Sequence, residues 1–261
     1  MSDAELKTAA RDLASLIRQS SHAIAFTGAG LSTESGIPDF RSPGGLWTQN
    51  KPIPFQAFMA SRDARTEAWR RKFVMDESFR SAAPGRGHRV LATMARAGRL
   101  AGIITQNIDN LHQDSGVADD RLVELHGNGS YATCLACARR YELAWVRERF
   151  DAQGGAAPDC EACGGPVKSA TISFGQAMPE REMQRATRWT LDSDLFICIG
   201  SSLVVYPAAG LPIAAKQNGA RLVIVNREET PLDEIADLVV PAEIGPLLMA
   251  VATELGLGLD C

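Results

Sequence analysis

Four of the six cysteines form two pairs with the spacing of metal ligands. Cys134 and Cys137 make one Cys-x-x-Cys pair, Cys160 and Cys163 make the other, and residues 138–159 separate them. Two thiolates at this spacing can bind one metal ion from a tight turn, and two such turns complete the tetrahedral set that zinc prefers. A redox pair or four ordinary buried thiols are the alternatives. Because four thiolates leave no position for an activated water, we expect a structural zinc and look for the chemistry elsewhere.

A glycine turn after an apolar run has the composition of a phosphate-binding loop. Residues 22–27 form the run, residues 28–30 read Gly-Ala-Gly, and hydroxyls follow at 32 and 33. Such a turn places backbone N–H groups where a pyrophosphate can bind at a helix N-terminus. A simple turn is the alternative, because the complete Gly-x-Gly-x-x-Gly fingerprint is absent. The Asp-Phe-Arg sequence at 39–41 favours nucleotide binding, since it adds a carboxylate, an aromatic ring and a guanidinium.

Polar side chains gather at the ends of further apolar runs. Residues 105–112 read Thr-Gln-Asn-Ile-Asp-Asn-Leu-His, residues 124–128 read Glu-Leu-His-Gly-Asn, and a glycine with two serines occupies 200–202. Open α/β sheets bind ligands at the carboxyl ends of their strands, so we expect these segments to meet. A helix N-cap would explain one polar side chain between 106 and 110 but not four. Residues 226–227, Asn-Arg, suit contacts to a ribose or an adenine.

The segments between these motifs predict a parallel sheet. Apolar runs typical of strands occupy residues 22–27, 100–105, 171–174, 195–199, 221–225 and 238–240. Helical patterns at 86–96, 208–218 and 246–255 each end beside a glycine, where a helix C-terminus favours one. Strands that alternate with helices indicate an α/β fold with a doubly wound, Rossmann-like parallel sheet.

Two stretches interrupt the alternation and predict a smaller lobe. Residues 42–82 carry prolines and aromatic residues and suggest a loop with helices, whereas residues 131–169 hold the cysteine pairs. We therefore expect one domain of residues 1–261 with two lobes. The large lobe comprises residues 1–41, 83–130 and 170–261, and the small lobe comprises a helical insertion, 42–82, and a metal-binding insertion, 131–169.

Composition excludes several classes of protein. The 261 residues are 45% hydrophobic and 22% charged, with a net charge of −4, which is ordinary for a globular protein. Positive and negative charges also cancel between Cys134 and Lys168, so we expect no direct nucleic-acid binding. No run approaches the roughly 20 apolar residues of a membrane span, and the first 19 residues resemble an amphipathic helix rather than a signal peptide. We expect a cytoplasmic protein with reduced thiols and no membrane partner.

Taken in order, six motifs resemble those of the sirtuin family. They are GAGLSTESGIPDFR, TQNIDNLHQDSG, ELHGN, the paired Cys-x-x-Cys motifs, FGQ and GSSLVVYPAA, and the resemblance extends over about residues 20–230. It implies a Rossmann-like lobe beside a small lobe made of a zinc ribbon and a helical module. It also implies an NAD-dependent protein-lysine deacylase that consumes NAD, holds one structural zinc and takes an acylated-lysine protein or peptide as its partner.

The resemblance further implies how such a reaction proceeds. The acyl oxygen of an acyl-lysine attacks the anomeric carbon of the nicotinamide ribose, and nicotinamide leaves. His126 is then the general base that activates the 2′-hydroxyl, through the ribose, against the resulting imidate. An imidazole with an ordinary pKa of about 6.5 suits this task at neutral pH. The products are free lysine, nicotinamide and O-acyl-ADP-ribose.

The same resemblance assigns the contacts to NAD. Asp109 would bind the nicotinamide carboxamide, because a carboxylate accepts hydrogen bonds and fits the amide N–H₂. Phe40 would cover the reacting face of the sugar and exclude water. The expected NAD contacts are Gly28, Ala29, Gly30, Thr33, Asp39, Phe40, Arg41, Gln106, Asn107, Ile108, Asp109, Gly200, Ser201, Ser202, Asn226 and Arg227.

The acylated peptide is expected to add as a strand between two segments. These segments contain Phe174, Gly175 and Gln176, and Val204, Val205 and Tyr206. Gln176 stands where the family commonly has glutamate, and the missing charge is expected to weaken a preference for basic peptides. Family members that prefer acidic acyl chains carry a Tyr-x-x-Arg pair, and Ala68 and Arg71 align with it here. Without the tyrosine, we expect acetyl and other neutral acyl chains to be preferred.

Two other functions remain as alternatives. The same activated ribose could meet another nucleophile, which would make the protein an ADP-ribosyltransferase of the sirtuin type or an NAD hydrolase. A zinc ribbon could also serve a non-catalytic binding module, although the balanced charge between Cys134 and Lys168 argues against that interpretation.

Overall fold

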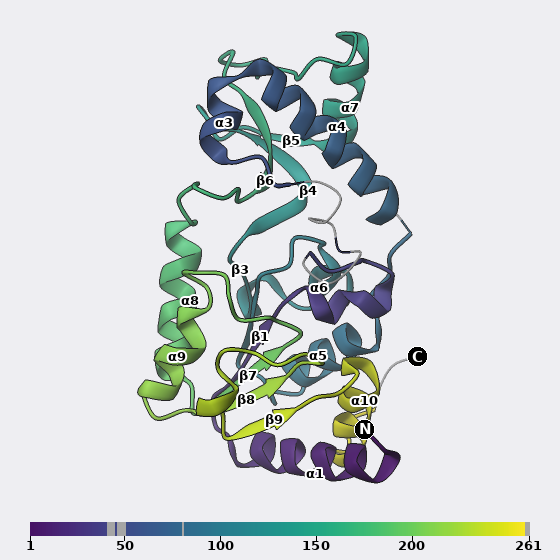
Figure 1. The fold of residues 1–261 in the computed structure, drawn as a ribbon, viewed down its shortest axis with the longest axis vertical. Helices are drawn as coiled ribbons and strands as arrows, with labels where there is room; N and C mark the ends of the chain where they lie inside the picture. The colour runs from purple at the N-terminus through teal and green to yellow at the C-terminus, as the bar shows by residue number, and fades with distance from the viewer. Residues whose placement is uncertain (41–44, 46–50, 80, 259–261) are drawn as a thin grey trace.

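A parallel sheet of six strands forms the centre of the larger lobe in the computed structural model, which describes residues 1–40, 45, 51–79 and 81–258 (Figure 1). The strand order is β3-β2-β1-β7-β8-β9, so the chain reverses its direction of winding between β1 and β7. In such sheets the ligand crevice lies at this reversal. The strands are β1 Ala23–Thr27, β2 Gly102–Thr105, β3 Leu122–Glu124, β7 Leu195–Ile199, β8 Arg221–Val225 and β9 Leu238–Val240.

Both faces of this sheet are covered, which explains why its central strands are continuous apolar runs. All five residues of β1 and all five of β7 are buried. Successive side chains along a strand point to opposite faces. Accordingly, Ala23 and Ala25 pack in one hydrophobic cluster, whereas Ile24 and Phe26 pack in the other.

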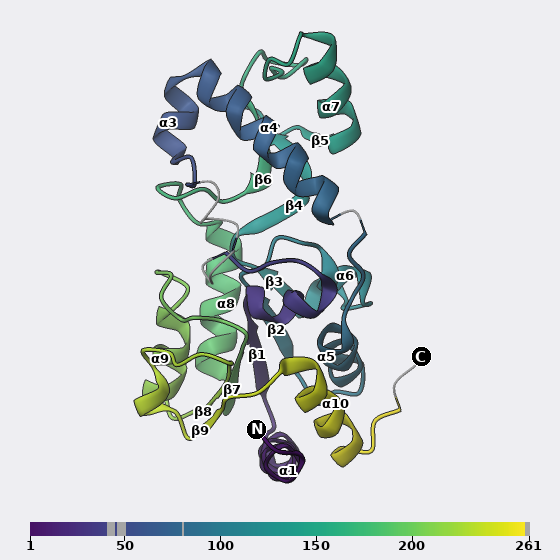
Figure 2. The same cartoon turned by 45° about the vertical axis from the view of Figure 1, so that its right-hand side comes forward.

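Two groups of helices supply these covers, as Figure 2 shows. Helices α1 (Asp3–Gln19), α5 (Arg86–Arg96) and α10 (Ile244–Glu254) pack on one face of the sheet, and α8 (Glu180–Asp192) and α9 (Gly210–Gln217) pack on the other. The first helix begins where Ser2 and Glu5 cap each other's backbone N–H groups, and it buries Leu13 and Ile17. The short elements η1 (Ala29–Ser35), α6 (Leu111–Asp114), η2 (Asp119–Arg121) and η3 (Asp233–Ile235) lie in connecting segments.

The smaller lobe contains an antiparallel sheet with the order β5-β4-β6, formed by β5 (Arg140–Glu142), β4 (Gly127–Cys134) and β6 (Val167–Thr171). Helices α3 (Phe55–Ala60), α4 (Arg62–Phe79) and α7 (Leu143–Ala152) surround it at the top of Figure 1. The indole of Trp69 on α4 is buried and donates a hydrogen bond to the Val167 carbonyl at 3.0 Å. A helix from the first insertion therefore packs directly on the cysteine-containing insertion.

The predicted fold class is confirmed, but one predicted strand is wrong. Residues 172–174 are not a strand of the parallel sheet, because the strand ends at Thr171 and belongs to the antiparallel sheet. β-Branched and aromatic residues made this segment resemble a buried strand. The helix expected after Gly28 is a short 3₁₀ helix, η1. Among the described residues, no helix has the length and apolar character needed to cross a membrane.

Candidate active site

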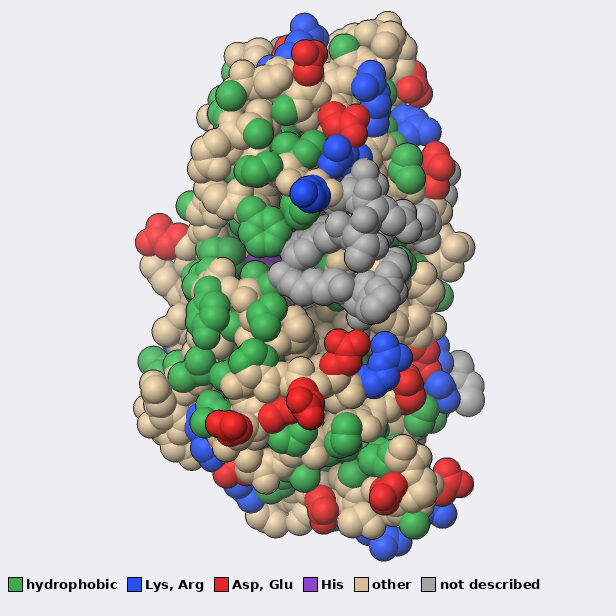
Figure 3. Space-filling view, viewed as in Figure 1, with side chains coloured by type: hydrophobic (Ala, Val, Ile, Leu, Met, Phe, Trp, Pro, Cys, Tyr) green, Lys and Arg blue, Asp and Glu red, His purple; other side chains and the backbone are tan. Residues whose placement is uncertain are grey.

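A cleft of about 880 Å³ lies between the two lobes, at the carboxyl ends of the central parallel strands. This volume is within the range of about 300–1,000 Å³ that small-molecule sites occupy. Hydrophobic side chains gather on the surface at this level of the molecule (Figure 3). The cleft joins segments from both lobes, from η1 and the loops after β2, β7 and β8 to α4 and the residues that follow β6.

Most of the predicted site residues line this cleft. Asp109 and Val204 are described residues that lie outside the lining, and Arg41 lies outside the described part of the chain. The predicted residues in the lining are Gly28, Ala29, Gly30, Thr33, Asp39, Phe40, Gln106, Asn107, Ile108, His126, Phe174, Gly175, Gln176, Gly200, Ser201, Ser202, Val205, Tyr206, Asn226 and Arg227.

The glycine turn after β1 packs against the loop after β7 without room for side chains. A Cβ atom on Gly28 would lie 2.7 Å from the Gly200 carbonyl oxygen, and one on Gly30 would lie 2.8 Å from the Gly200 Cα. The N–H of Gly30 donates to the Gly200 carbonyl at 2.9 Å. Glycine at both positions therefore lets the two loops pack directly on each other, and the cleft that they line is large enough for a dinucleotide.

Two amide side chains after β2 are fixed by hydrogen bonds within the protein. Asn107 is 5% exposed, and its Nδ2 donates to the Gly28 carbonyl and to Ser32 Oγ, each at 3.1 Å. The Nε2 of Gln106 donates to Ser201 Oγ at 2.8 Å. These contacts join the loop after β2 to the loops after β1 and β7, so the polar floor of the cleft is preorganised.

Asp109 lies outside the cleft lining and is connected to Asn107 through Ser32. Its Oδ2 accepts a hydrogen bond from Ser32 Oγ at 2.6 Å, and its Oδ1 accepts one from the Leu111 N–H at 3.0 Å. Each carboxylate oxygen can accept a second hydrogen bond, so the group remains able to bind an amide N–H₂. Ser32 was not among the predicted site residues, although its place in the glycine turn is the signal that could have identified it.

His126 lies between β3 and β4, at the junction of the two lobes. Its Nδ1 is 3.0 Å from the carbonyl oxygen of Gln106. A carbonyl only accepts hydrogen bonds, so Nδ1 carries the proton and Nε2 is the ring nitrogen that can accept another. The backbone contact therefore selects the tautomer that a general base needs.

Two further histidines, His88 and His112, are buried next to Ser32 and Thr27, and neither was among the predicted site residues. The Nε2 of His112 is 2.9 Å from Thr27 Oγ1, and the two imidazole rings lie edge to face with centroids 5.3 Å apart. Burial, and then the neighbouring His88, lower the pKa of His112 to about 3, and burial lowers the pKa of His88 as well. Both rings are therefore neutral at physiological pH.

Asn128 connects the strand after His126 to the loop after β2. Its Nδ2 donates to Asn110 Oδ1 at 2.9 Å and to Glu124 Oε1 at 2.8 Å, and its Oδ1 accepts the Ser130 N–H at 2.8 Å. Burial raises the pKa of Glu124. The contacts of Asn128 hold the His126 segment and the Asp109 loop together, a role that its position two residues after His126 did not reveal.

Apolar side chains are exposed at the rim of the cleft. Phe174 is 46% exposed, Val204 is 44% exposed and Tyr206 is 66% exposed. Within the same rim, Gln176 Oε1 accepts the Ser173 N–H at 3.1 Å, which fixes the turn after Ile172. Exposed aromatic residues beside a cleft are typical of a surface that binds another chain.

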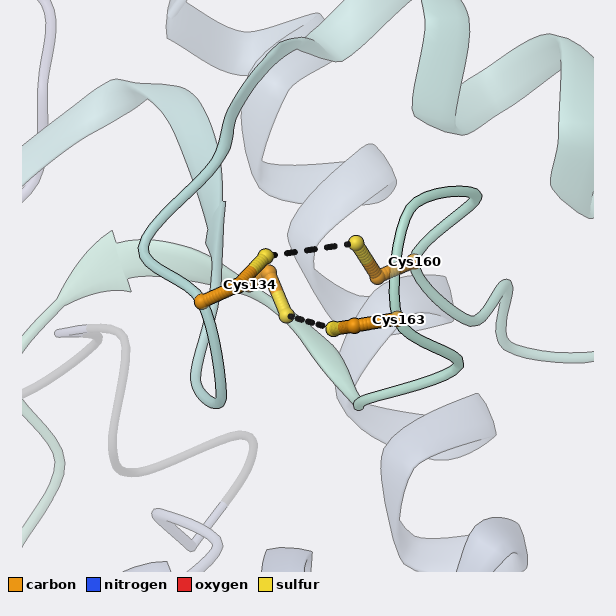
Figure 4. A group of neighbouring side chains, drawn as sticks. Cys134, Cys160 and Cys163 are labelled. Atoms are coloured by element: carbon orange, nitrogen blue, oxygen red, sulfur yellow. Dashed lines mark hydrogen bonds between the residues drawn. The ribbon is translucent and has the colours of Figure 1, made fainter.

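The four predicted metal ligands converge in the small lobe. Their sulfur atoms all lie within 4.8 Å of one another, with 3.5 Å between Cys134 and Cys163 and 3.6 Å between Cys137 and Cys160. Figure 4 shows Cys134 facing Cys160 and Cys163, which lie together on the opposite loop. Tetrahedral zinc with bonds of about 2.3 Å needs sulfur atoms about 3.8 Å apart, so the cluster fits zinc. A hydrogen bond with the Tyr141 hydroxyl lowers the pKa of Cys160 to about 6, which favours the thiolate.

Comparisons with known proteins agree with this site. The NAD-dependent protein deacetylase 1 of Bradyrhizobium diazoefficiens is 59% identical over 244 residues, which cover 94% of this chain and 95% of the relative. The NAD-dependent protein deacetylase of Rhodopseudomonas palustris is also 59% identical, over 93% of this chain and 96% of the relative. A solved structure described as a Sir2–p53 peptide–NAD⁺ complex superposes with a TM-score of 0.85 at 34% identity, covering 94% of this chain and 98% of the other.

A family model adds the remaining comparison. The model described as the Sir2 family matches residues 28–207, which contain the glycine turn, His126 and all four clustered cysteines. By this match and by the identity to its relatives, the chain belongs to the Sir2 family.

Proposed function

We propose that this protein is an NAD-dependent protein-lysine deacylase. It consumes NAD and an acyl-lysine and yields nicotinamide, O-acyl-ADP-ribose and free lysine. The observation that carries the proposal is the tautomer of His126, whose Nδ1 is committed to the Gln106 carbonyl beside a cleft that fits a dinucleotide. The names of the relatives, which describe NAD-dependent protein deacetylases, support the same activity.

His126 is the general base in this proposal. Its Nε2 accepts the proton of a ribose hydroxyl, while the Gln106 carbonyl stabilises the imidazolium that forms. Asp109 accepts a hydrogen bond from the nicotinamide carboxamide, and the Ser32 and Leu111 donors hold its carboxylate in place. Phe40, in the cleft lining, shields the reacting sugar from water.

NAD is held by the segments that end the central strands. The backbone of Gly28 to Gly30, with Thr33, binds the pyrophosphate and ribose, and Gln106 and Asn107 contact the nicotinamide ribose. The loops after β7 and β8 complete the adenosine side through Gly200, Ser201, Ser202, Asn226 and Arg227. Asp39, Ile108 and Arg41 complete the proposed contacts, and the close packing of Gly28 and Gly30 on Gly200 supports this arrangement.

The acylated peptide adds as a strand at the exposed rim. One side of its seat is Phe174, Gly175 and Gln176, and the other is Val204, Val205 and Tyr206. The exposure of Phe174 and Tyr206 supports this position, because their apolar surfaces become covered when a peptide binds.

Zinc is bound by Cys134, Cys137, Cys160 and Cys163, and it stabilises the small lobe without entering the reaction. The complete set of four thiolates supports a structural role, since no coordination position is left for a substrate. Reduced thiols suit a cytoplasmic protein, which is the location we propose. We also propose the division into lobes that the sequence predicts, with insertions at 42–82 and 131–169; the packing of Trp69 on Val167 supports a small lobe built from both insertions.

Neutral acyl chains are the proposed substrates. Arg71 lines the cleft, but its Nε forms an ion pair with Glu67 Oε1 at 2.6 Å and its Nη1 donates to the Lys51 carbonyl at 2.8 Å. An arginine whose charge is already paired offers little attraction to a second carboxylate. We expect acetyl-peptide turnover to exceed succinyl-peptide turnover, and the opposite ranking would refute this preference.

Mass spectrometry of NAD and an acetyl-lysine peptide tests the proposed function. Wild-type protein is expected to form O-acetyl-ADP-ribose, and His126→Ala is expected to lower its rate by about 10²–10⁴-fold. Thr8→Ala, an exposed substitution on α1, is the matched control. Nicotinamide release with an ADP-ribosylated protein would instead indicate ADP-ribosyl transfer, and no consumption of NAD would refute the enzyme.

A further inference from the structure

Lys168 is a buried cation in the cleft that the proposed reaction does not use. It lies on β6, is 4% exposed and lines the cleft. Within the described part of the chain it forms no ion pair with a carboxylate, and burial lowers its pKa to about 8. Burying an ammonium group is unfavourable unless its N–H groups find partners, so its contacts indicate its role.

The ammonium group bonds to the backbone of its own strand. Nζ donates to the Ser169 carbonyl at 3.3 Å and to the Thr171 carbonyl, and it lies 6.0 Å from the ring centroid of Phe58 on α3. The two carbonyls flank Ala170. One side chain therefore bridges the last residues of β6 and reaches the helical insertion.

These carbonyls lie where the pairing of β4 with β6 is irregular. Gly127 pairs with Thr171 and Ala132 pairs with Ser169, so residues 128–131 of β4 lie opposite a single residue, Ala170. A regular ladder cannot continue across such a mismatch. The Lys168 ammonium donates to carbonyls at the point where the ladder is interrupted.

The same stretch of β6 is in direct contact with the catalytic segment. The Ile172 N–H donates to the His126 carbonyl at 2.8 Å. Gly127 has a φ of 70°, and a Cβ atom there would lie 2.0 Å from the Ala170 carbonyl oxygen. Residues 170–172 thus pack against His126 and Gly127 with no space between them, and the proposed peptide segment begins two residues later.

We propose that Lys168 is a positioning residue for deacylation: its ammonium binds the two carbonyls that flank the mismatched residue Ala170 and so holds the His126 segment in register with the peptide segment at 174–176. This inference rests on the proposed function. It assigns Lys168 no contact with a reacting atom. Its effect is on the relative placement of the general base and the acyl group.

The variants Lys168→Met and Lys168→Arg test this proposal. Methionine keeps the length and removes the donors, and arginine keeps the charge and the donors. We expect Lys168→Met to lower kcat for an acetyl peptide by about 10–100-fold while retaining one zinc per chain, because misplaced reacting groups lose rate steeply. We expect Lys168→Arg to stay within about threefold of the wild type. Lys216→Met, which removes a partly exposed lysine paired with Asp237, is the matched control.

Three readouts separate the outcomes. A folded, zinc-loaded Lys168→Met protein whose kcat and peptide Kd both stay within twofold of wild type would overturn the proposal. If the methionine variant loses zinc, Lys168→Gln is tested by the same criteria, and loss of zinc there too would assign Lys168 to folding and overturn the proposal. A wild-type protein that forms no O-acetyl-ADP-ribose refutes the proposed function itself, whereas a loss confined to the Lys168 variants concerns this residue alone.

Discussion

The two lobes differ in what holds their functional residues in place. In the large lobe, helices cover both faces of the sheet, and the central strands β1 and β7 are wholly buried. Among the described residues of the small lobe, one cluster of ten buried side chains serves as the core, and two of its members are Cys134 and Cys160. A core of this size supplies little stability, so small lobes depend on metals. Hydrophobic burial thus positions the proposed NAD contacts, whereas the four-cysteine site positions the small-lobe side of the cleft.

Removing the metal should therefore have the largest effect, and this effect should fall mainly on the small lobe. Structural zinc contributes an apparent free energy of about 10–16 kcal/mol to folding, so Cys160→Ser or chelation should unfold the small lobe and lower deacylation by about 100-fold or more. Zinc content, near-ultraviolet circular dichroism and NAD consumption measure these changes. Cys198→Ala removes a thiol from the large-lobe core and should keep the metal. A metal-free protein that still deacylates would break the comparison.

Two aromatic deletions should sharpen the comparison. Trp69→Ala in the small lobe and Phe196→Ala in the large lobe should each lower the free energy of unfolding by about 3–5 kcal/mol, because each side chain is almost fully buried. Only Trp69→Ala should accelerate the release of zinc to a chelator, since only Trp69 packs on the cysteine cluster. Equal release rates in the two variants would show that the lobes unfold as one unit.

Acid should act on the large lobe through His112. Burial and the neighbouring His88 lower the pKa of His112 to about 3, below the ordinary value of 6.5. The unfolded chain therefore binds a proton at His112 more readily than the folded chain does. The contribution of His112 to the free energy of unfolding thus has its full value above pH 6.5 and falls by up to about 1.4 kcal/mol per pH unit as the pH drops toward 3. Urea midpoints between pH 4 and 7 should fall less steeply in His112→Gln than in wild type, and His22→Gln is the control. Urea midpoints that fall equally steeply with pH in His112→Gln and in wild type would refute the prediction.

The smallest expected effect is at the rim of the cleft. Gln176→Glu keeps an oxygen that can accept the Ser173 N–H and adds a negative charge beside the peptide seat. We expect kcat/KM for acetyl peptides with flanking lysines to rise about twofold to fivefold at low salt and the gain to disappear at high salt. An unchanged preference between basic and neutral peptides would refute the role assigned to Gln176.

Local patterns sufficed to predict five of the six strands of the large-lobe sheet, but the short edge strand β3 was missed. Residues 195–199 and 221–225 are strands with the bounds that their apolar runs predict, because strands buried on both faces need apolar side chains at every position. In contrast, β4 was missed, since its beginning reads Gly-Asn-Gly-Ser and resembles a loop. Its pairing with β6 is a contact distant in sequence, and no local propensity encodes it.

The site residues that belong to a sequence motif could be predicted, whereas the residues that are positioned by packing between distant segments could not. His126 and the segment at 106–109 came from motifs that resemble those of the sirtuin family, and His126, Gln106, Asn107 and Ile108 all line the cleft. The positions of Lys168 and Asn128 depend on an irregular pairing and on a loop 18 residues away in the chain. Such supporting side chains look like ordinary surface polar residues until the fold buries them.

The pairing of Gly127 with Thr171 means that the chain enters and leaves the ribbon at a single point. At this point the chain passes through two adjacent strands, β4 and β6. Joining these two strands with a short linker would carry a small loop-closure entropy. Another metal-binding module with similarly spaced ends could be grafted there without redirecting the parallel sheet. A module grafted at this point would lie next to His126, so the binding of its metal would control the position of that histidine.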